Sequence, residues 1–184
     1  RELKKKNKFL PPDPASSNYC TVGGMIANNS SGVHCLGYGN TIDFIQAVEL
    51  VYADGSSGYA SSTNYDGKMS LLRKLLGSHI DLVRNGYPGV KKNSCGYRLD
   101  AVIHNKFQPQ KILAASEGTL GLVTSAQFQT MDIPDNRCLM VLGFADVKDA
   151  VQAVPAILQF SPAALELLDH TVFLYSGKAE KGSL

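Results

Sequence analysis

Residues 20–39 constrain the fold of this chain more than any other stretch. Five glycines, two asparagines and three serine or threonine residues surround a short apolar run at residues 25–27. Glycine lets a backbone approach a ligand closely or adopt a positive φ angle, and it loses more conformational freedom on folding than other residues do. So many glycines around an apolar turn predict a specialised backbone rather than a plain connection.

The start of this stretch is suited to binding an anion. The pair Gly23 and Gly24 precedes a short helical turn, whose first N–H groups have no partner within the helix and point the same way. Such groups favour a phosphate, and Thr21 is placed to cap the turn. We therefore expect a phosphate-bearing cofactor here; a tight glycine-rich turn without a ligand is the alternative.

The length, composition and net charge of the chain are those of a folded protein without a strong charge bias. The 184 residues suffice for one domain, or for one domain and part of another. An apolar fraction of 44% can supply a core, and a net charge of +2 gives no support to nucleic-acid or membrane-surface binding as the main activity. No apolar run reaches the roughly 20 residues that a membrane helix needs. Because the chain starts at Arg1 rather than methionine, we expect it to be a piece of a longer protein.

Cysteine and histidine positions do not predict a metal site. The four cysteines are Cys20, Cys35, Cys95 and Cys138. They are widely spaced, without a Cys-x-x-Cys pair or paired histidines nearby. We expect reduced, mostly buried thiols in a cytoplasmic protein, since no signal peptide is visible. Cys95 has no identifiable histidine neighbour, so we expect a small buried residue there and not a nucleophile.

Periodicity and turn signals predict mixed helices and strands up to residue 133. Residues 3–9 suggest a short basic helix that ends at the prolines of residues 11–14. Residues 48–52 and 56–60 read as two strands joined by a hairpin turn at Asp54 and Gly55. Apolar residues recur at helical spacing over residues 68–84, with a break at Gly77 and Ser78. Further elements are expected at residues 98–104 (helix), 109–114 (helix) and 122–130 (strand).

The pattern restarts beyond residue 133. Residues 138–144 are expected to form a strand, residues 147–160 a helix, and residues 164–168 a second strand. Asp146 can cap the helix, and Pro155 should kink it or start a second short helix. This β-α-β unit looks like the opening of a second domain.

Six segments of the chain resemble one known family, in the same order. They are residues 9–14, 21–32 with Tyr38 and Gly39, 51–55, 92–99, 116–124 and 164–169. Any one of them alone is a weak match, but six in order across nearly the whole chain make a specific one. The chain resembles the FAD-linked oxidases, whose FAD-binding domain is of the vanillyl-alcohol-oxidase-like, or PCMH, type. Within that family it is similar to glycolate oxidase FAD subunits and D-lactate dehydrogenases.

The resemblance implies an α+β fold with two parts. Residues 1–133 would be the later part of the FAD-binding domain, its antiparallel-sheet subdomain, without the first subdomain that carries a glycine-rich pyrophosphate loop. Residues 134–184 would be the beginning of a ferredoxin-like cap, or substrate, domain. The family's histidine-rich substrate and metal site lies outside these residues, so we expect no metal ligand and name no catalytic residue.

The resemblance also implies where FAD would lie along residues 20–39. Gly23 and Gly24, after Thr21, would give backbone N–H groups to the pyrophosphate, and Ala27 would let the backbone pass close to it. The residues expected near the ribityl chain or the flavin are Asn28, Ser31 and Gly32. No covalent flavin link is expected at His34, since that attachment in the family belongs to a different motif.

Other segments are expected to complete the cofactor site. Pro12 would abut the cofactor, although a Pro-Pro pair is equally a rigid spacer. The residues expected on the adenine and ribose side are Glu117, Gly118, Gly121 and Val123; an ordinary turn before a strand is the alternative. Lys92 and Asn93 would face the active site or solvent. The family often has arginine just before Tyr-Gly, whereas this chain has Leu36 and Gly37, which removes a positive charge.

The implied function is FAD-dependent oxidation of a 2-hydroxy acid such as glycolate or D-lactate, by hydride transfer to the flavin. The implied partners are that small molecule, an electron acceptor of unknown kind and other subunits of an oxidase complex. We expect the parent protein to be cytoplasmic or peripheral to the inner membrane through partners, and this piece to be inactive alone. The alternatives are a non-catalytic FAD-binding or assembly subunit of a multi-subunit oxidase, and a folded piece that binds no cofactor.

Overall fold

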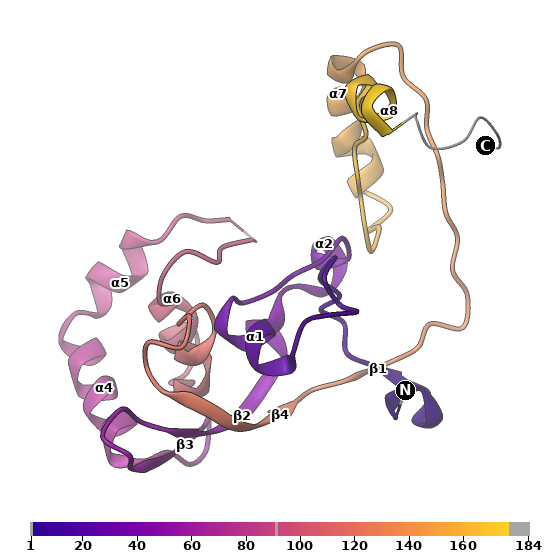
Figure 1. Cartoon of the computed structure of the whole chain (residues 1–184). Helices are drawn as coiled ribbons and strands as arrows, with labels where there is room; N and C mark the ends of the chain where they lie inside the picture. Colours follow the sequence, from indigo (N-terminus) through magenta and orange to yellow (C-terminus); the bar gives the residue numbers. More distant parts are fainter. Residues whose placement is uncertain (1, 91, 177–184) are drawn as a thin grey trace.

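The chain has an α+β fold in which a small antiparallel sheet supports a group of helices (Figure 1). The computed structural model describes residues 2–90 and 92–176. The strands are β1 (Lys8–Phe9), β2 (Ile45–Val51), β3 (Ser57–Ser61), β4 (Leu122–Phe128) and β5 (Met131–Asp132). The helices are α1 (Val22–Ala27), α2 (Cys35–Tyr38), α3 (Thr41–Phe44), α4 (Gly67–Ser78), α5 (Ile80–Gly86), α6 (Leu99–Ile103), α7 (Val147–Leu158) and α8 (His170–Ser176), with 3-10 turns η1 (Leu3–Lys6) and η2 (Pro109–Leu113).

The larger sheet has the order β3-β2-β4, with every neighbouring pair antiparallel. The predicted hairpin is confirmed, because Asp54 and Gly55 connect β2 to β3 and Gly55 adopts a φ of 80°. Asp54 also accepts a hydrogen bond from the backbone N–H of Ser56 (3.0 Å), which fixes the turn locally. The strand predicted from residue 122 is likewise confirmed as β4.

The hydrophobic core lies between this sheet and the helices. Buried side chains on β2 and β3 pack against α4, α5, α6 and η2. The central members are Ile26, Val48, Leu50, Ala60, Met69, Leu76, Val83, Val102 and Leu113. The helical pattern over residues 68–84 is confirmed as two abutting helices, although the break falls at His79 and not at Gly77 and Ser78. The predicted helices near residues 98–104 and 109–114 are confirmed as α6 and the 3-10 turn η2.

The first residues form a smaller unit than predicted. Instead of one helix over residues 3–9, η1 ends at Asn7, which adopts a left-handed φ of 53°. β1 then pairs with β5, and Lys8 forms an ion pair of 2.7 Å with Asp132. Pairing with a strand far along the chain replaces the last turn of the expected helix.

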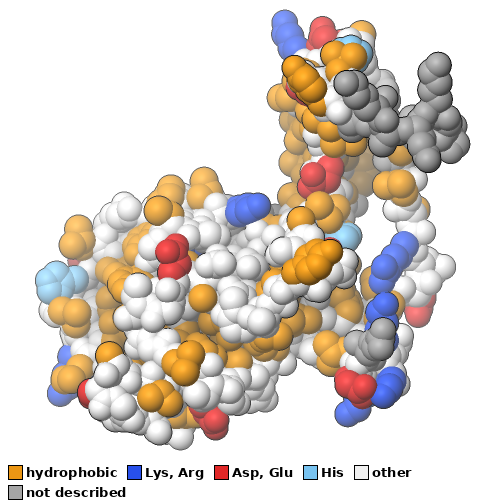
Figure 2. Space-filling model, viewed as in Figure 1, with side chains coloured by type: hydrophobic (Ala, Val, Ile, Leu, Met, Phe, Trp, Pro, Cys, Tyr) orange, Lys and Arg blue, Asp and Glu red, His pale blue; other side chains and the backbone are white. Residues whose placement is uncertain are grey.

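The C-terminal part differs from the predicted β-α-β unit. The helix is confirmed as α7, whose start is capped by Asp146 accepting from the N–H of Asp149 (2.9 Å), and Pro155 lies within it. Neither predicted strand is present among the described residues: residues 138–144 are extended without a partner, and residues 164–168 are irregular. A strand needs neighbours to satisfy its backbone, and none is supplied here. The apolar side chains of this part therefore remain exposed, with Leu139 at 89% (Figure 2).

The thiols are less buried than expected. All four cysteines are free, Cys20 and Cys35 are half-buried, and Cys95 and Cys138 are exposed. The predictions of mostly buried thiols and of a buried Cys95 were therefore wrong, because Cys95 lies in a turn-rich loop and Cys138 in the extended segment. Among the described residues, none of the helices combines the length and the apolar character that crossing a membrane requires.

Candidate cofactor site

Helix α1 begins the glycine-rich stretch and is fixed at both ends. The prediction that Thr21 caps it is confirmed: its hydroxyl oxygen accepts a hydrogen bond from the N–H of Gly24 (3.1 Å). Met25 and Ile26 are buried and hold the helix on the core. The first turn consequently faces outward, and no described atom lies within 4 Å of a Cβ placed on Gly23. The helix start is therefore open around Gly23, and its first N–H groups have no partner within the helix.

The other end of α1 meets a segment from much later in the chain. The N–H of Ala115 donates to the carbonyl oxygen of Ile26 (3.1 Å), and the N–H of Glu117 donates to that of Ala27 (2.9 Å). Ala115, Glu117 and Gly118 all have positive φ angles, of 62°, 51° and 76°. A backbone held in this sparsely populated region costs energy, so the surrounding contacts must impose it. The structure thus brings together two segments that the sequence analysis assigned to one site.

Asn29 connects the segment after α1 to two other parts of the chain, and the sequence analysis missed it. Its side chain is fully buried: the amide oxygen accepts from the N–H of Ile42 (2.9 Å), and the amide nitrogen donates to the carbonyl of Asn93 (3.0 Å). Its φ of 46° is one that asparagine tolerates better than most residues. The adjacent Asn28, which the sequence analysis chose, is exposed. Asn29 therefore joins the glycine stretch to α3 and to the loop that contains Asn93.

A half-buried charge cluster supports the same loop. Arg98 binds both carboxylate oxygens of Asp100 (2.8 and 2.6 Å) and donates a third hydrogen bond to the carbonyl of Asn93 (3.0 Å). Burial acts to raise the pKa of Asp100, but the hydrogen bond and the charge of Arg98 outweigh it and hold that pKa below its usual range. Burial lowers the pKa of Lys111, with Asp43 opposing the shift and Arg98 adding to it. Asn93 is thus half-buried in a loop that hydrogen bonds hold in place, whereas Lys92 is exposed.

Residues 9–14 close the other side of the glycine stretch. Pro12 is buried, and the neighbouring Asp13 binds Nδ1 of His34 through its carboxylate (2.5 Å). A Cβ on Gly32 would lie only 2.0 Å from the main-chain oxygen of Asp13, so this close approach requires glycine. Ser31 is half-buried beside it. Pro12, Ser31 and Gly32 are therefore brought together around Asp13.

Gly121 and Val123 position the strand that follows the Glu117 turn. Gly121 adopts a φ of 154°, and a Cβ there would lie 2.7 Å from the carbonyl oxygen of Val51. Val123 pairs with Leu50 across the sheet, and its side chain packs on the core. These two residues fix where β4 enters the sheet. Both residues follow Glu117 closely in the sequence.

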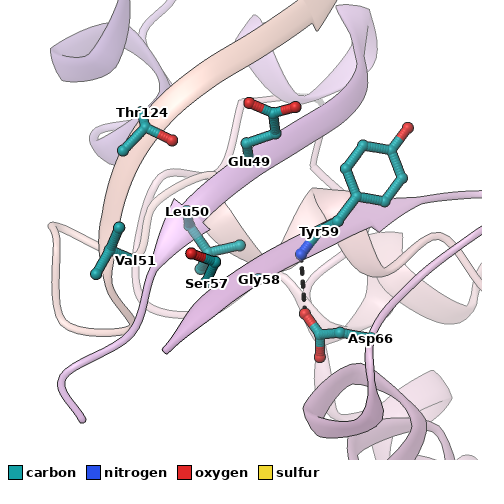
Figure 3. A pocket seen from close by; sticks show the side chains of 8 residues that line it. All are labelled: Glu49, Leu50, Val51, Ser57, Gly58, Tyr59, Asp66 and Thr124. Atoms are coloured by element: carbon teal, nitrogen blue, oxygen red, sulfur yellow. Dashed lines mark hydrogen bonds between the residues drawn. The ribbon is translucent and has the colours of Figure 1, made fainter. Parts of the chain in front are cut away.

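Two hollows accompany these elements. The first has a volume of about 220 Å³ and is lined by Gly96, Tyr97, Ala115, Ser116, Glu117 and Thr119. It is bridged by the hydroxyl groups of Tyr97 and Thr119, which lie 2.8 Å apart. The second, of about 360 Å³, lies across β2, β3 and β4 (Figure 3). Only the first includes a predicted site residue, Glu117, among the described residues.

Comparison with known proteins finds family matches at both ends of the chain. Residues 1–57 match the family model described as an FAD binding domain, and residues 133–183 match that for the C-terminal domain of FAD linked oxidases. The chain is 30% identical over 176 residues to the glycolate oxidase subunit GlcD of Bacillus subtilis. The chain is therefore similar to the FAD-linked oxidases at both of its ends.

Two further relatives of this chain carry related names. It is 24% identical over 180 residues to a D-lactate dehydrogenase of Anaerostipes hadrus, and 24% identical over 191 residues to a D-2-hydroxyglutarate dehydrogenase of Pseudomonas putida. The three alignments cover 95%, 97% and 96% of this chain, but only 30%, 30% and 19% of the relatives. The chain thus spans less than a third of the length of each.

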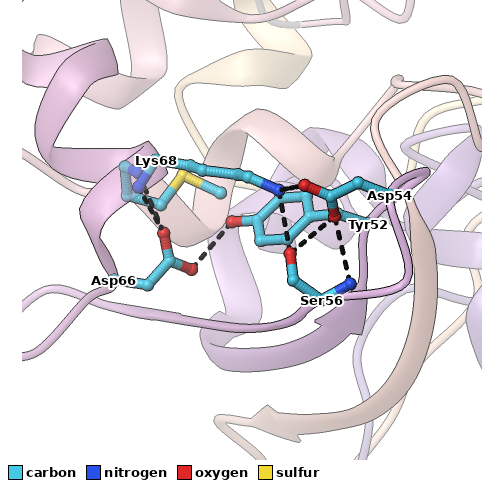
Figure 4. A network of polar contacts seen from close by, with 6 residues as sticks. Tyr52, Asp54, Ser56, Asp66 and Lys68 are labelled. Carbon is cyan, nitrogen blue, oxygen red and sulfur yellow. Dashed lines mark hydrogen bonds and ion pairs between the residues drawn. The ribbon is translucent and has the colours of Figure 1, made fainter.

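A polar network elsewhere in the chain is structural (Figure 4). The hydroxyl of Tyr52 donates to Asp66 (2.7 Å), and Lys68 forms an ion pair with Asp54 (2.7 Å) while lying over the ring of Tyr52. Burial and the hydrogen bond to Asp66 raise the pKa of Tyr52 well above its usual range. The network joins the hairpin turn to the start of α4, which Asp66 caps. It contains none of the predicted site residues.

Proposed function

We propose that this chain is part of an FAD-dependent oxidoreductase, and that residues 20–39 hold the FAD pyrophosphate and the edge of the flavin. The observation that carries the proposal is the pair of hydrogen bonds from Ala115 and Glu117 to Ile26 and Ala27. The family resemblance assigns these two segments to the pyrophosphate side and to the adenine and ribose side. One dinucleotide can contact both only if they adjoin, as they do here.

The residues at the start of α1 fit a pyrophosphate. The open space at Gly23 allows a ligand to approach the first turn, and unpaired N–H groups at a helix start suit an anion. The N–H of Gly24 already bonds to Thr21, so we assign phosphate binding to Gly23 and a supporting role to Gly24. Gly118, whose Cβ position is equally open, would let the backbone pass the adenine and ribose side.

The remaining predicted residues have distinct parts in this proposal. Ala27, half-buried at the end of α1, keeps the backbone close to the ligand, and the exposed amide of Asn28 is free to turn toward it. Ser31, Gly32 and Pro12 would line the opposite side. Gly121 and Val123 fix where β4 enters the sheet, and they would thereby hold the Glu117 turn in place.

We further propose a 2-hydroxy acid, such as glycolate or D-lactate, as the substrate of the parent protein. The names of the relatives, which are glycolate oxidase, D-lactate dehydrogenase and D-2-hydroxyglutarate dehydrogenase, support this class. Bound FAD supplies the hydride acceptor for such an oxidation. The residues described here would bind and orient the cofactor and exclude water from its phosphate side.

The proposal includes a division of the chain and an assembly. Residues 1–133 would be the later part of an FAD-binding domain, and residues 134–184 the beginning of a ferredoxin-like cap domain; the family match over residues 133–183 supports this boundary. Because the GlcD relatives are named as subunits, we propose that the parent protein assembles with other subunits of an oxidase.

Anaerobic titration of the intact, FAD-loaded protein tests the proposed reaction. Addition of glycolate, D-lactate or D-2-hydroxyglutarate should bleach the visible flavin absorbance. Propionate, which lacks the 2-hydroxyl group of lactate, is the matched control and should leave the spectrum unchanged. Loaded protein that keeps its full absorbance with all three acids would exclude the proposed substrate class.

A further inference from the structure

Gly37, in the short helix α2, contacts a segment from the C-terminal part of the chain. Its N–H donates to the carbonyl oxygen of Ala163 (3.1 Å), a residue in the connection between α7 and α8, and also to that of His34 (3.2 Å), which precedes α2. A Cβ on Gly37 would lie 2.7 Å from Cα of Ala163 and 3.1 Å from its carbonyl oxygen. These obstacles are backbone atoms, which cannot rotate away as a flexible side chain can. Glycine is therefore needed for this contact.

The contact is made by the turn that joins α7 to α8. Residues 162–165 of this turn are half-buried, and so are Ala150, Ala153, Val154 and Ile157 of α7. In Figure 1 the turn that joins α7 to α8 reaches toward α2, while both helices stand away from the sheet. The C-terminal part thus meets the rest of the chain through this turn.

Helix α2 is itself held on the candidate cofactor site. His34, which precedes α2, binds Asp13, and the ring of Tyr38 packs edge-on against Phe9 at 5.6 Å. At the other side, the thiol of Cys35 lies 3.1 Å from the side-chain oxygen of Asn40. Since Asp13 also lies against Gly32, a segment docked on α2 is placed next to the Gly32 corner of the site.

We propose that Gly37 is a docking notch that receives the turn around Ala163 and thereby sets the position of the C-terminal part beside the candidate cofactor site. This explains in physical terms why a long basic side chain before Tyr38 is absent from this chain. Any side chain at residue 37 would push the Ala163 backbone away and break the hydrogen bond. The proposal concerns only the contact between Gly37 and Ala163, so its test does not depend on whether the cofactor binds.

Hydrogen–deuterium exchange of the intact protein tests the notch, with Gly37→Ala as the variant. Gly77→Ala is the matched control, because Gly77 also lies in a helix but has no described atom within 4 Å of its Cβ position. Amides of residues 161–166 should exchange about tenfold faster in G37A than in the wild type, since a local contact controls local opening. In G77A they should exchange as in the wild type.

The same experiment also shows whether each variant still folds. Protection of β2 reports whether the sheet still folds, and it should be equal in all three proteins. Equal exchange of residues 161–166 in G37A and the wild type would overturn the proposal. If G37A also loses β2 protection, the wild type decides alone: amides of residues 161–166 that exchange as fast as that of the exposed Gly89 would overturn the proposal.

Discussion

The N–H of Glu117 donates a 2.9 Å hydrogen bond to the carbonyl oxygen of Ala27, joining the end of α1 to the turn before β4. The neighbouring bond from Ala115 to Ile26 makes this a two-point attachment. It satisfies carbonyl groups that a helix end leaves without an intrahelical partner. The attachment joins two segments that are distant in sequence and that we propose to form one cofactor site.

Replacing Asn29 should destabilise the fold. Asn29→Ala leaves the N–H of Ile42 without its partner, and a buried group left unpaired costs about 1–3 kcal/mol. It also removes one of the two donors to the carbonyl of Asn93, which keeps its bond from Arg98. Urea denaturation measures the loss. Asn28→Ala is the matched control and should change stability by less than about 0.5 kcal/mol, because that side chain is exposed. Equal stability of the two variants would contradict the role given to Asn29.

Gly32 should not accept even a methyl group. In Gly32→Ala the new Cβ would meet the main chain of Asp13 at 2.0 Å, and forcing extra volume into a packed site costs about 1–3 kcal/mol. The thermal midpoint should therefore fall. Gly86→Ala, where no described atom lies within 4 Å of the Cβ position, should leave the midpoint unchanged or raise it. A G32A midpoint at or above that of the wild type would refute the close approach.

The capping role of Thr21 predicts a graded response. Thr21→Ala removes the acceptor for the N–H of Gly24, and loss of such a cap costs about 0.5–2 kcal/mol. Thr21→Ser keeps the hydroxyl and should retain most of the stability. Chemical denaturation of the three proteins gives the order wild type, T21S, T21A from most to least stable; a T21S as unstable as T21A would argue against capping.

The Arg98–Asp100 pair predicts a dependence on acid. The folded state lowers the pKa of Asp100, so its contribution is fully present above the unfolded value, about 3.9. It is lost as the pH falls below that value and through the folded pKa, because the unfolded state then binds the proton more readily. The stability difference between wild type and Asp100→Asn should therefore be constant above about pH 5 and shrink toward pH 3. A difference that grows on acidification would reverse the sign of this linkage.

Local signals in the sequence predicted local structure well. The Asp54 and Gly55 turn and the helical spacing over residues 68–84 depend on neighbours in sequence, and both predictions are confirmed. The strand expected at residues 138–144 was wrong because a strand needs a partner, which periodicity cannot supply. Asn29 was missed for a related reason: its partners, Ile42 and Asn93, become neighbours only in the fold. The spacing of asparagines alone does not distinguish it from Asn28.

The proposed roles of the site residues are predictions. The role of Gly23, at the start of α1, is the first to test. Gly23 offers a sharp test, because its Cβ position is open in the protein and we propose that the phosphate lies there. Alanine is also the better helix former, so Gly23→Ala should not reduce stability. A loss of binding without a loss of stability would separate ligand contact from folding.

The most direct measurement is therefore FAD affinity of the intact protein, followed by flavin fluorescence, for wild type, Gly23→Ala and the control Gly77→Ala. We predict that the wild type and G77A bind FAD alike, and that G23A binds about tenfold or more weakly, which is about 1.4 kcal/mol, while its thermal midpoint is unchanged or higher. Equal FAD affinity in all three proteins, or no FAD binding by the wild type, would contradict the assignment of residues 20–39 to the cofactor.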